Sequence, residues 1–213
     1  MSLIKLETEY PVAIDSPDHI APAGTIADNR TDKDYVKAVK EYFEESKDTK
    51  ILDMGCAGGQ MIADFIEDGY TAVGLEGSTH AHQGAGAANW SKYLNKNFFN
   101  VDLAKPFQLK EDGEDMKFNF IHSWDVLEHI HPDDLGIWFD NVKNHLADDG
   151  VLAIEHDDPY DCKTCPPSSH SASGSHQCTL CVAGTYLESN GVAASNCKVC
   201  SEGEWSLIGA TFC

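Results

Sequence analysis

The stretch KILDMGCAGGQMIADFIEDGYTAVGLEGS, residues 50–78, decides the fold. A short apolar strand at Ile51-Leu52 leads into a turn of small residues, and a second apolar strand covers residues 71–75. Between them, four apolar residues recur at helical spacing, namely Met61, Ile62, Phe65 and Ile66. Glycines in such a turn let the backbone approach a ligand closely. The stretch therefore predicts a βαβ unit with a nucleotide-cofactor site.

The glycine pattern narrows the choice of cofactor. A dinucleotide site needs G-x-G-x-x-G, but Ala57 stands two residues after Gly55. The acidic Asp53 before the turn would repel a pyrophosphate, and it suits a cationic ligand that carries an amino group. Glu76, which follows the second strand, can accept hydrogen bonds from ribose hydroxyls.

These residues resemble the first motif of class I S-adenosylmethionine-dependent methyltransferases, D-x-G-C-G-x-G, with Ala57 in place of the middle glycine. The resemblance implies that the cofactor is S-adenosylmethionine. It places the methionine part near Asp53, the ribose near Glu76 and the adenine near Asp102. The residues that we expect to bind the cofactor are Asp53, Gly55, Cys56, Ala57, Gly59, Glu76, Gly77, Asp102, Leu103 and Trp124.

Further strands and helices alternate along the chain. Residues 98–103, 118–124 and 151–155 predict three more strands, residues 79–97 and 132–146 predict helices, and residues 108–117 predict a polar loop. Thr31 and Asp34 resemble a capping box before an amphipathic helix. We therefore expect an α/β fold with a Rossmann-like, doubly wound parallel sheet of order 3-2-1-4-5. Its site should lie at the carboxyl edge beside the first strand.

The segment SWDVLEHIHP, residues 123–132, looks like the V-L-E-H-I segment common in small-molecule methyltransferases. Asp125, Glu128 and His129 also resemble a cluster that binds a divalent metal in ubiquinone-type O-methyltransferases. Three interpretations stay open, namely a divalent metal site, His129 as a general base, and a structural role in the loop. We take these three residues as the candidate catalytic group and assign no metal ligand. His122 and His131 are interpreted as incidental.

The chain has 213 residues and a formal net charge of −20. The last 52 residues contain two lysines against three glutamates, so about −19 lies in residues 1–161. Such an acidic surface repels phosphate backbones, which argues against nucleic acid as a partner. The sequence contains no apolar run of about 18 residues, so no membrane span is predicted. The first fifteen residues lack the apolar core of a secretory signal.

Cysteine usage suggests how the chain is divided. Cys56 is alone in the first 161 residues, and the other seven cysteines lie in the last 52. We expect an N-terminal arm or lid (1–30), a methyltransferase-like domain (31–158) and a cysteine-rich region (159–213). A surface arm is the preferred interpretation of residues 1–30. After residue 155 the chain lacks the helix and β6–β7 hairpin of class I methyltransferases, so we expect a truncated sheet with its fifth strand at an exposed edge.

The tail has the spacing C-x2-C-x12-C-x2-C-x15-C-x2-C-x12-C and resembles extracellular ephrin-receptor-like cysteine-rich repeats. The resemblance implies the disulfides Cys165–Cys178, Cys181–Cys197 and Cys200–Cys213, with Cys162 left over. Few large apolar residues are available there, which favours a disulfide-rich tail. A four-cysteine zinc site is the alternative, because Cys162, Cys165, Cys178 and Cys181 also have suitable spacing.

The sequence is compatible with two functions. The leading hypothesis is a methyltransferase that acts on a small-molecule or protein acceptor, with full activity doubtful because the C-terminal strands are missing. The alternative is a non-catalytic interaction protein, in which a degenerate methyltransferase fold is a scaffold and the tail contacts partners. The methyltransferase half is expected in the cytoplasm, whereas a disulfide-rich tail suggests an extracellular setting.

Overall fold

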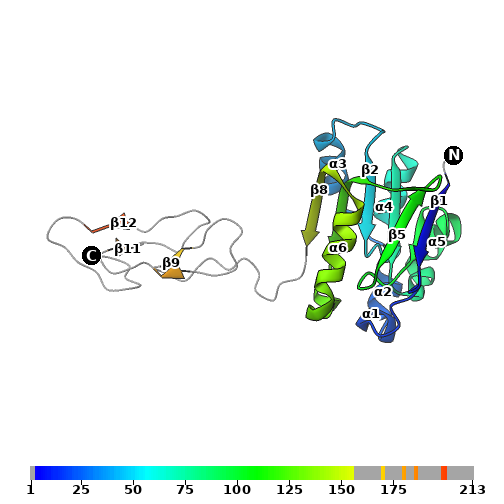
Figure 1. Cartoon of the computed structure of the whole chain (residues 1–213), viewed down its shortest axis with the longest axis horizontal. Helices are drawn as coiled ribbons and strands as arrows, with labels where there is room; N and C mark the ends of the chain where they lie inside the picture. The colour runs from blue at the N-terminus through cyan, green and yellow to red at the C-terminus, as the bar shows by residue number, and fades with distance from the viewer. Residues whose placement is uncertain (1–2, 156–168, 171–178, 181–184, 187–197, 201–213) are drawn as a thin grey trace. The chain divides into compact units, whose positions relative to one another are not determined.

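The structure is a computed structural model that describes residues 3–155, 169–170, 179–180, 185–186 and 198–200 (Figure 1). The chain divides into two compact units, Met1–Asp157 and Asp158–Cys213. In the second unit, β9 (Ser169–His170) pairs with β10 (Thr179–Leu180), and β11 (Thr185–Tyr186) pairs with β12 (Lys198–Val199). Cys200 is disulfide-bonded. The other tail cysteines lie outside the described residues, as do the predicted repeats, disulfide pairs and zinc site.

The first unit is built around a five-stranded parallel sheet. Its strands are β2 (Lys50–Met54), β3 (Thr71–Glu76), β4 (Phe98–Asn100), β7 (Phe118–Trp124) and β8 (Leu146–Glu155). They lie in the order β4-β3-β2-β7-β8, and every neighbouring pair is parallel. In chain order this is 3-2-1-4-5, so the predicted α/β fold and its strand order are confirmed.

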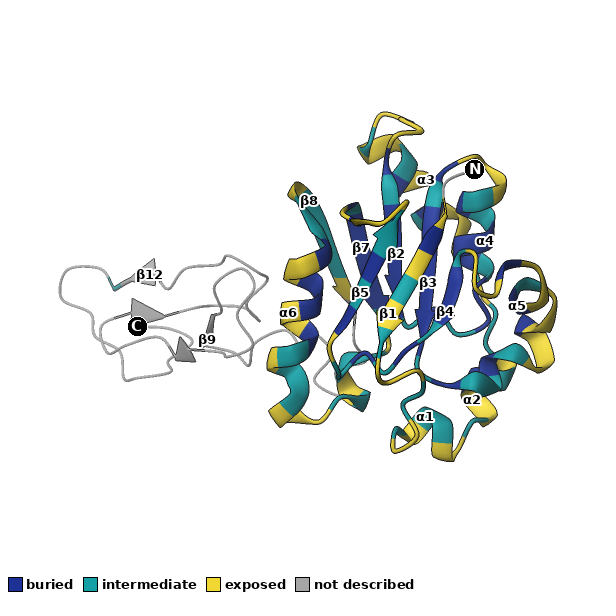
Figure 2. Ribbon diagram, turned by 45° about the vertical axis from the view of Figure 1, so that its right-hand side comes forward, coloured by how far each residue is buried: buried dark blue, intermediate teal, exposed yellow. Residues whose placement is uncertain are grey.

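Alternating side chains of the strands build two apolar layers. Ile51 and Phe120 pack on one face against α3 (Lys33–Tyr42), α4 (Gln60–Glu67) and α5 (Ala87–Tyr93). Leu52 and Ile121 pack on the opposite face against α6 (Leu135–His145) and a small second sheet. Figure 2 shows the central strands largely buried and the outward surfaces of the helices exposed. Because both faces are covered, apolar residues such as Ile51-Leu52 and Phe120-Ile121 follow one another directly along the strands.

The small second sheet corrects one prediction. Residues 108–117 are not a polar loop, because β5 (Phe107–Glu111) and β6 (Glu114–Asp115) form a hairpin there. β5 also pairs antiparallel with β1 (Ile4–Thr8), at the other end of the domain's sequence. Asp112 and Gly113 have φ values of 52° and 95°, as required in a two-residue type I′ turn. The Asp-Gly pair was the local signal for this hairpin.

Other boundaries also differ from the predicted ones. The N-cap of α3 is Asp32 rather than Thr31, because the Asp32 carboxylate accepts hydrogen bonds from the backbone N–H groups of Asp34 and Tyr35. The predicted helix over 79–97 begins with two 3-10 turns, η1 (Thr79–His82) and η2 (Gly84–Gly86), before α5. β4 ends at Asn100 instead of residue 103, and β8 begins at Leu146 instead of residue 151.

Short elements complete the first unit around the carboxyl ends of the strands. They are α1 (Pro17–Ile20), α2 (Ala23–Ala27), η3 (Leu127–His129) and η4 (Pro132–Asp134). Within the described residues β8 pairs with β7 alone, so it is an edge strand of that part of the sheet, as expected. Among the same residues, no helix is long and apolar enough to cross a membrane.

The turn between β2 and α4 depends on Gly59, which has a φ of 77° and is the N-cap of α4. A Cβ at this position would lie 2.1 Å from the ring of buried Phe98. We predict that Gly59→Ala lowers the free energy of unfolding by about 2–4 kcal/mol, because it adds steric overlap to left-handed strain. Urea unfolding of the full chain measures this loss.

Gly113→Ala is the matched control. Gly113 also has a positive φ, of 95°, but nothing lies within 4 Å of its added Cβ. Its substitution should cost only about 1 kcal/mol, from left-handed strain. Equal losses for the two variants would contradict the steric explanation for Gly59.

Candidate functional site

A cavity of about 1310 Å³ lies at the carboxyl ends of the parallel strands. Its walls come from the turns that follow β2, β3 and β7, from the loop after β4, and from the N-terminal segment. Most of the residues expected to bind the cofactor line it, namely Asp53, Gly55, Cys56, Ala57, Glu76, Gly77, Asp102, Leu103 and Trp124. Gly59 is not among the lining residues, and its close neighbour is Phe98.

Glu76 lies at the end of β3 and is 7% exposed. One carboxylate oxygen accepts the backbone N–H of Ser78 at 2.8 Å, and the other accepts that of Ala57 at 3.0 Å. Burial raises the pKa of Glu76 to about 7, although these backbone hydrogen bonds act in the opposite direction. Each oxygen keeps a further lone pair, so the carboxylate can still accept hydrogen bonds from a ligand in the cavity.

Asp53 ends up close to Glu76, because β2 and β3 are adjacent in the sheet. The Asp53 side chain is 6% exposed, and within the described residues no hydrogen bond reaches its carboxylate. Its polar contact is His122, whose Nε2 lies 3.7 Å from Oδ2. Burial raises the pKa of Asp53 well above its ordinary value, and the nearby Glu76 and Asp28 add to this shift. A cationic group in the cavity would relieve this accumulation of carboxylates.

Ala57, the residue that replaces the expected glycine, has a left-handed φ of 44°. That conformation costs a residue with a Cβ about 1–2 kcal/mol. Two contacts hold it, since the Ala57 N–H donates to Glu76 and its carbonyl accepts the indole N–H of Trp90 at 2.8 Å. Trp90 is 1% exposed and lies in the core. Neighbouring Cys56 is buried too, and burial raises the pKa of its thiol, so the thiol stays protonated.

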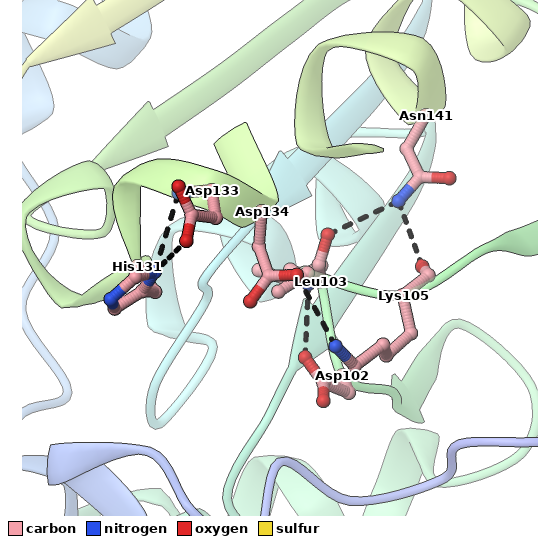
Figure 3. Close-up of polar contacts among 8 residues, drawn as sticks. Asp102, Leu103, Lys105, His131, Asp133, Asp134 and Asn141 are labelled. Atoms are coloured by element: carbon pink, nitrogen blue, oxygen red, sulfur yellow. Dashed lines mark hydrogen bonds and ion pairs between the residues drawn. The ribbon is translucent and has the colours of Figure 1, made fainter. Parts of the chain in front are cut away.

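The loop after β4 carries Asp102 and Leu103 to the cavity (Figure 3). Asp102 accepts the backbone N–H of Ala104, at 2.9 Å. From α6, the amide of Asn141 donates to the carbonyls of Leu103 and Lys105, at 3.1 and 2.9 Å, as Figure 3 shows. Asn141 is 2% exposed and fixes the path of this loop. The sequence did not reveal this role of Asn141, because a polar residue in an amphipathic helix gives no sign of facing inward.

The structure brings two of the three candidate catalytic residues to the cavity. Asp125 and His129 line it, whereas Glu128 does not. His129 lies in η3, and its Nδ1 is 3.8 Å from Oδ2 of Asp18. Within the described residues, no group of three His, Cys, Asp or Glu side chains is arranged to hold a metal ion. Asp125 has a φ of 51°, so the backbone is strained where β7 meets the cavity.

The N-terminal segment contributes more to the site than a surface arm would. The carbonyl of Asp28 accepts the N–H of Gly58, and the Ala13 N–H donates to the carbonyl of Gly77. Asn29 donates to Gln60 and to the carbonyl of Ala85, and it accepts from Asn89. The segment thus contacts the glycine turn and the residues after β3. These contacts join positions far apart in the sequence, so local sequence patterns do not predict them.

The cavity is strongly acidic. Ten carboxylate residues line it, namely Asp15, Asp18, Asp28, Asp32, Asp34, Asp53, Glu76, Asp102, Asp125 and Asp134. Three basic residues, Arg30, Lys33 and Lys105, also line it. Two of them are already paired, since Arg30 contacts Asp28 at 2.9 Å and Lys105 contacts Asp134 at 3.4 Å. A ligand that carries several phosphate groups would be repelled from this lining.

One comparison with known proteins identifies a family. The family described as "Methyltransferase domain" matches residues 27–185. No curated protein matches the chain. A solved Pyrococcus horikoshii protein is 22% identical with a TM-score of 0.44, and the match covers 68% of this chain and 60% of that one.

Two solved structures of S-adenosylmethionine-dependent methyltransferases are also similar to this chain. The TehB-like protein of Corynebacterium glutamicum is 19% identical with a TM-score of 0.45, over 56% of this chain and 60% of that one. A protein of Clostridium acetobutylicum is 22% identical with a TM-score of 0.45, over 58% and 50%. The chain therefore spans 50–60% of the length of these three structures.

The raised pKa of Glu76 makes stability depend on pH in a defined direction. From about pH 4.5 to about pH 7, folded Glu76 keeps a proton that the unfolded chain has released. Its contribution to the free energy of unfolding therefore falls as pH rises across this window, by up to about 3 kcal/mol, and is constant above it. Urea unfolding of the wild type and of Glu76→Gln measures this contribution as the difference between the two proteins. A difference that does not change between about pH 5 and about pH 8 would contradict the assignment.

Proposed function

Because the chain belongs to the methyltransferase-domain family, which matches residues 27–185, we propose that this cavity binds S-adenosylmethionine and that the protein transfers its methyl group to an acceptor. The main support for this proposal is the position of Glu76. Glu76 is a buried carboxylate at the end of β3, faces the cavity and keeps lone pairs for ribose hydroxyls. Asp53, near the end of β2, and Asp102, in the loop after β4, come from the two strands beside β3 and line the same cavity.

The chemistry of the lining fits three parts of this cofactor, namely its ammonium group, its ribose and its adenine. Asp53 is a buried carboxylate without a hydrogen bond in the described part of the chain, which suits the ammonium group of the methionine part. Glu76 suits the ribose diol, and Asp102, with Leu103 beside it, suits the adenine amino group and ring. Gly55, Cys56 and Ala57 present backbone rather than bulky side chains to the same space.

When bound, the cofactor supplies a methyl group on a sulfonium centre, already activated for in-line displacement by a nucleophile. The protein therefore needs mainly to align the acceptor and exclude water. The N-terminal segment is placed for that task, because its contacts to Gly58 and Gly77 hold it against the cofactor side of the cavity. We propose that residues 13–34 act as a lid over the bound cofactor.

His129 is the residue that we assign as general base for the acceptor. It lines the cavity, is one-third exposed, and lies 3.8 Å from the Asp18 carboxylate, which can orient the ring and stabilise its charged form. Asp125 contributes negative charge at the same wall. Glu128, outside the lining, is left with a structural role in the η3 loop. No metal ion is required in this assignment.

The acceptor is a small molecule or a protein group that carries no phosphate. A cavity of about 1310 Å³ exceeds the roughly 300–1,000 Å³ typical of a site for one small ligand, which leaves room for an acceptor beside the cofactor. The excess of carboxylates in the lining favours a neutral or cationic acceptor and argues against nucleic acid. The alternative of a non-catalytic interaction protein depends on the tail, most of which lies outside the described residues.

The test is calorimetric titration of the full chain with S-adenosylhomocysteine, the product form of the cofactor. We expect saturable binding by the wild type and at least about a 100-fold loss of affinity in Glu76→Ala, because two charge-assisted hydrogen bonds disappear. Glu76→Gln, which can still accept a backbone hydrogen bond, should lose affinity while keeping the turn intact.

Glu67→Ala is the matched control for these variants. Glu67 is an exposed carboxylate at the end of α4, paired with Lys92 and absent from the cavity lining. Its removal should leave the affinity unchanged. A folded wild-type chain that fails to bind S-adenosylhomocysteine, or a Glu76→Ala variant that binds as tightly as the wild type, would overturn the proposed function.

A further inference from the structure

His122 is a buried titratable residue that the proposed function does not use. It lies on β7, in register with Asp53 on the adjacent parallel strand β2. Residues in register on neighbouring parallel strands point to the same face of the sheet. Accordingly, the His122 Nε2 lies 3.7 Å from Oδ2 of Asp53. Asp53 lines the cavity, whereas His122 does not.

The surroundings of His122 make a histidine at this position destabilising for the fold. The side chain is fully buried, and neither ring nitrogen has a hydrogen-bond partner within the described residues. The ring lies among aromatic side chains, 5.7 Å from Phe120, 6.0 Å from Trp124 and 5.9 Å from Tyr35 between centroids. Burial lowers the pKa of His122 to about 3, so the imidazole is neutral and keeps one N–H donor. An apolar residue would suit this position better, because a buried polar group without a partner destabilises the fold.

In the part of the chain that the structure describes, the Asp53 carboxylate lacks a hydrogen-bond donor, and the His122 imidazole can provide one. Within the described residues its carboxylate has no hydrogen-bond donor, and its charged neighbours are themselves acidic. Once a cationic ligand draws Asp53 into its ionised form, the oxygen that faces away from the ligand needs a donor. The His122 N–H would have to approach by about 0.5 Å to reach hydrogen-bond distance.

We propose that His122 is a positioning residue for the cofactor site, because its Nε2–H donates to the Asp53 carboxylate when that carboxylate pairs with the ammonium group of the cofactor. The donated hydrogen bond holds Asp53 in the orientation that faces the cavity and stabilises its ionised form. The stability lost by burying an unpaired imidazole in the ligand-free protein is recovered when the ligand binds. This inference rests on the proposed function.

The test compares affinity with stability in the full chain. His122→Leu removes the donor and fills the site with apolar atoms. We expect its thermal midpoint to be unchanged or higher than that of the wild type, while its affinity for S-adenosylhomocysteine falls by about 10-fold or more. His122→Gln should restore most of the affinity, because its side-chain amide can donate to Asp53. His122→Phe tests the same loss in case leucine disturbs the aromatic surroundings.

His145→Leu is the matched control, since His145 is the other fully buried histidine of the described part of the chain. Its Nε2 accepts the backbone N–H of Leu109 at 3.0 Å, and it does not line the cavity. We expect His145→Leu to lower the thermal midpoint without a selective loss of affinity. In an Asp53→Ala background, His122→Leu should have no further effect on affinity, because the acceptor is already gone.

Three results would overturn the inference. One is a His122→Leu or His122→Phe variant that binds S-adenosylhomocysteine as tightly as the wild type. Another is a loss of affinity that only follows a loss of stability, and the third is a His122→Gln variant that binds as weakly as His122→Leu. Failure of the wild type to bind would instead count against the proposed function, so the two failures are distinguishable.

Discussion

The contact between Glu76 and the backbone N–H groups of Ala57 and Ser78 joins the two turns that form the floor of the site. It connects the end of β3 to the glycine turn that follows β2, and it holds Ala57 in a left-handed conformation that its Cβ disfavours. The indole of Trp90 fixes the same residue from the helical layer. These contacts fix the turn that leads into α4, whose N-cap is Gly59.

The strand order also brings buried carboxylates together at the site. Asp53 and Glu76 are both buried, and burial raises the pKa of each. A fold that only needed stability would place apolar or hydrogen-bonded groups at these positions. The ends of adjacent parallel strands instead place two carboxylates together beside a neutral imidazole, and the N-terminal segment adds further acidic residues. This arrangement disfavours the empty site and favours a cationic ligand, so the electrostatics of the cavity follow from the strand order.

The sequence allowed the sheet to be predicted because its signals are local. Apolar strands that alternate with helices imply parallel pairing, and the turn at Gly55 and Gly59 identifies the strand beside the site. The pairing of β1 with β5 could not be predicted in the same way, because the partners lie about a hundred residues apart. Only the Asp112-Gly113 turn was visible, and it lies in a polar stretch that was interpreted as a loop. The roles of Asn141 and His122 depend on which way one side chain points in a packed layer, which composition does not reveal.

The most direct test of the site is amide hydrogen exchange of the full chain with and without S-adenosylhomocysteine. If the cofactor binds at the carboxyl edge, exchange should slow in peptides that cover residues 53–59, 76–78 and 102–105, and in the N-terminal segment over 13–34. The peptides of β1 and β5, on the far side of the sheet from α4, should be unchanged and provide an internal control. Slower exchange elsewhere, with no change at these four segments, would contradict the claim that the cofactor binds at the acidic cavity on the carboxyl edge of the sheet.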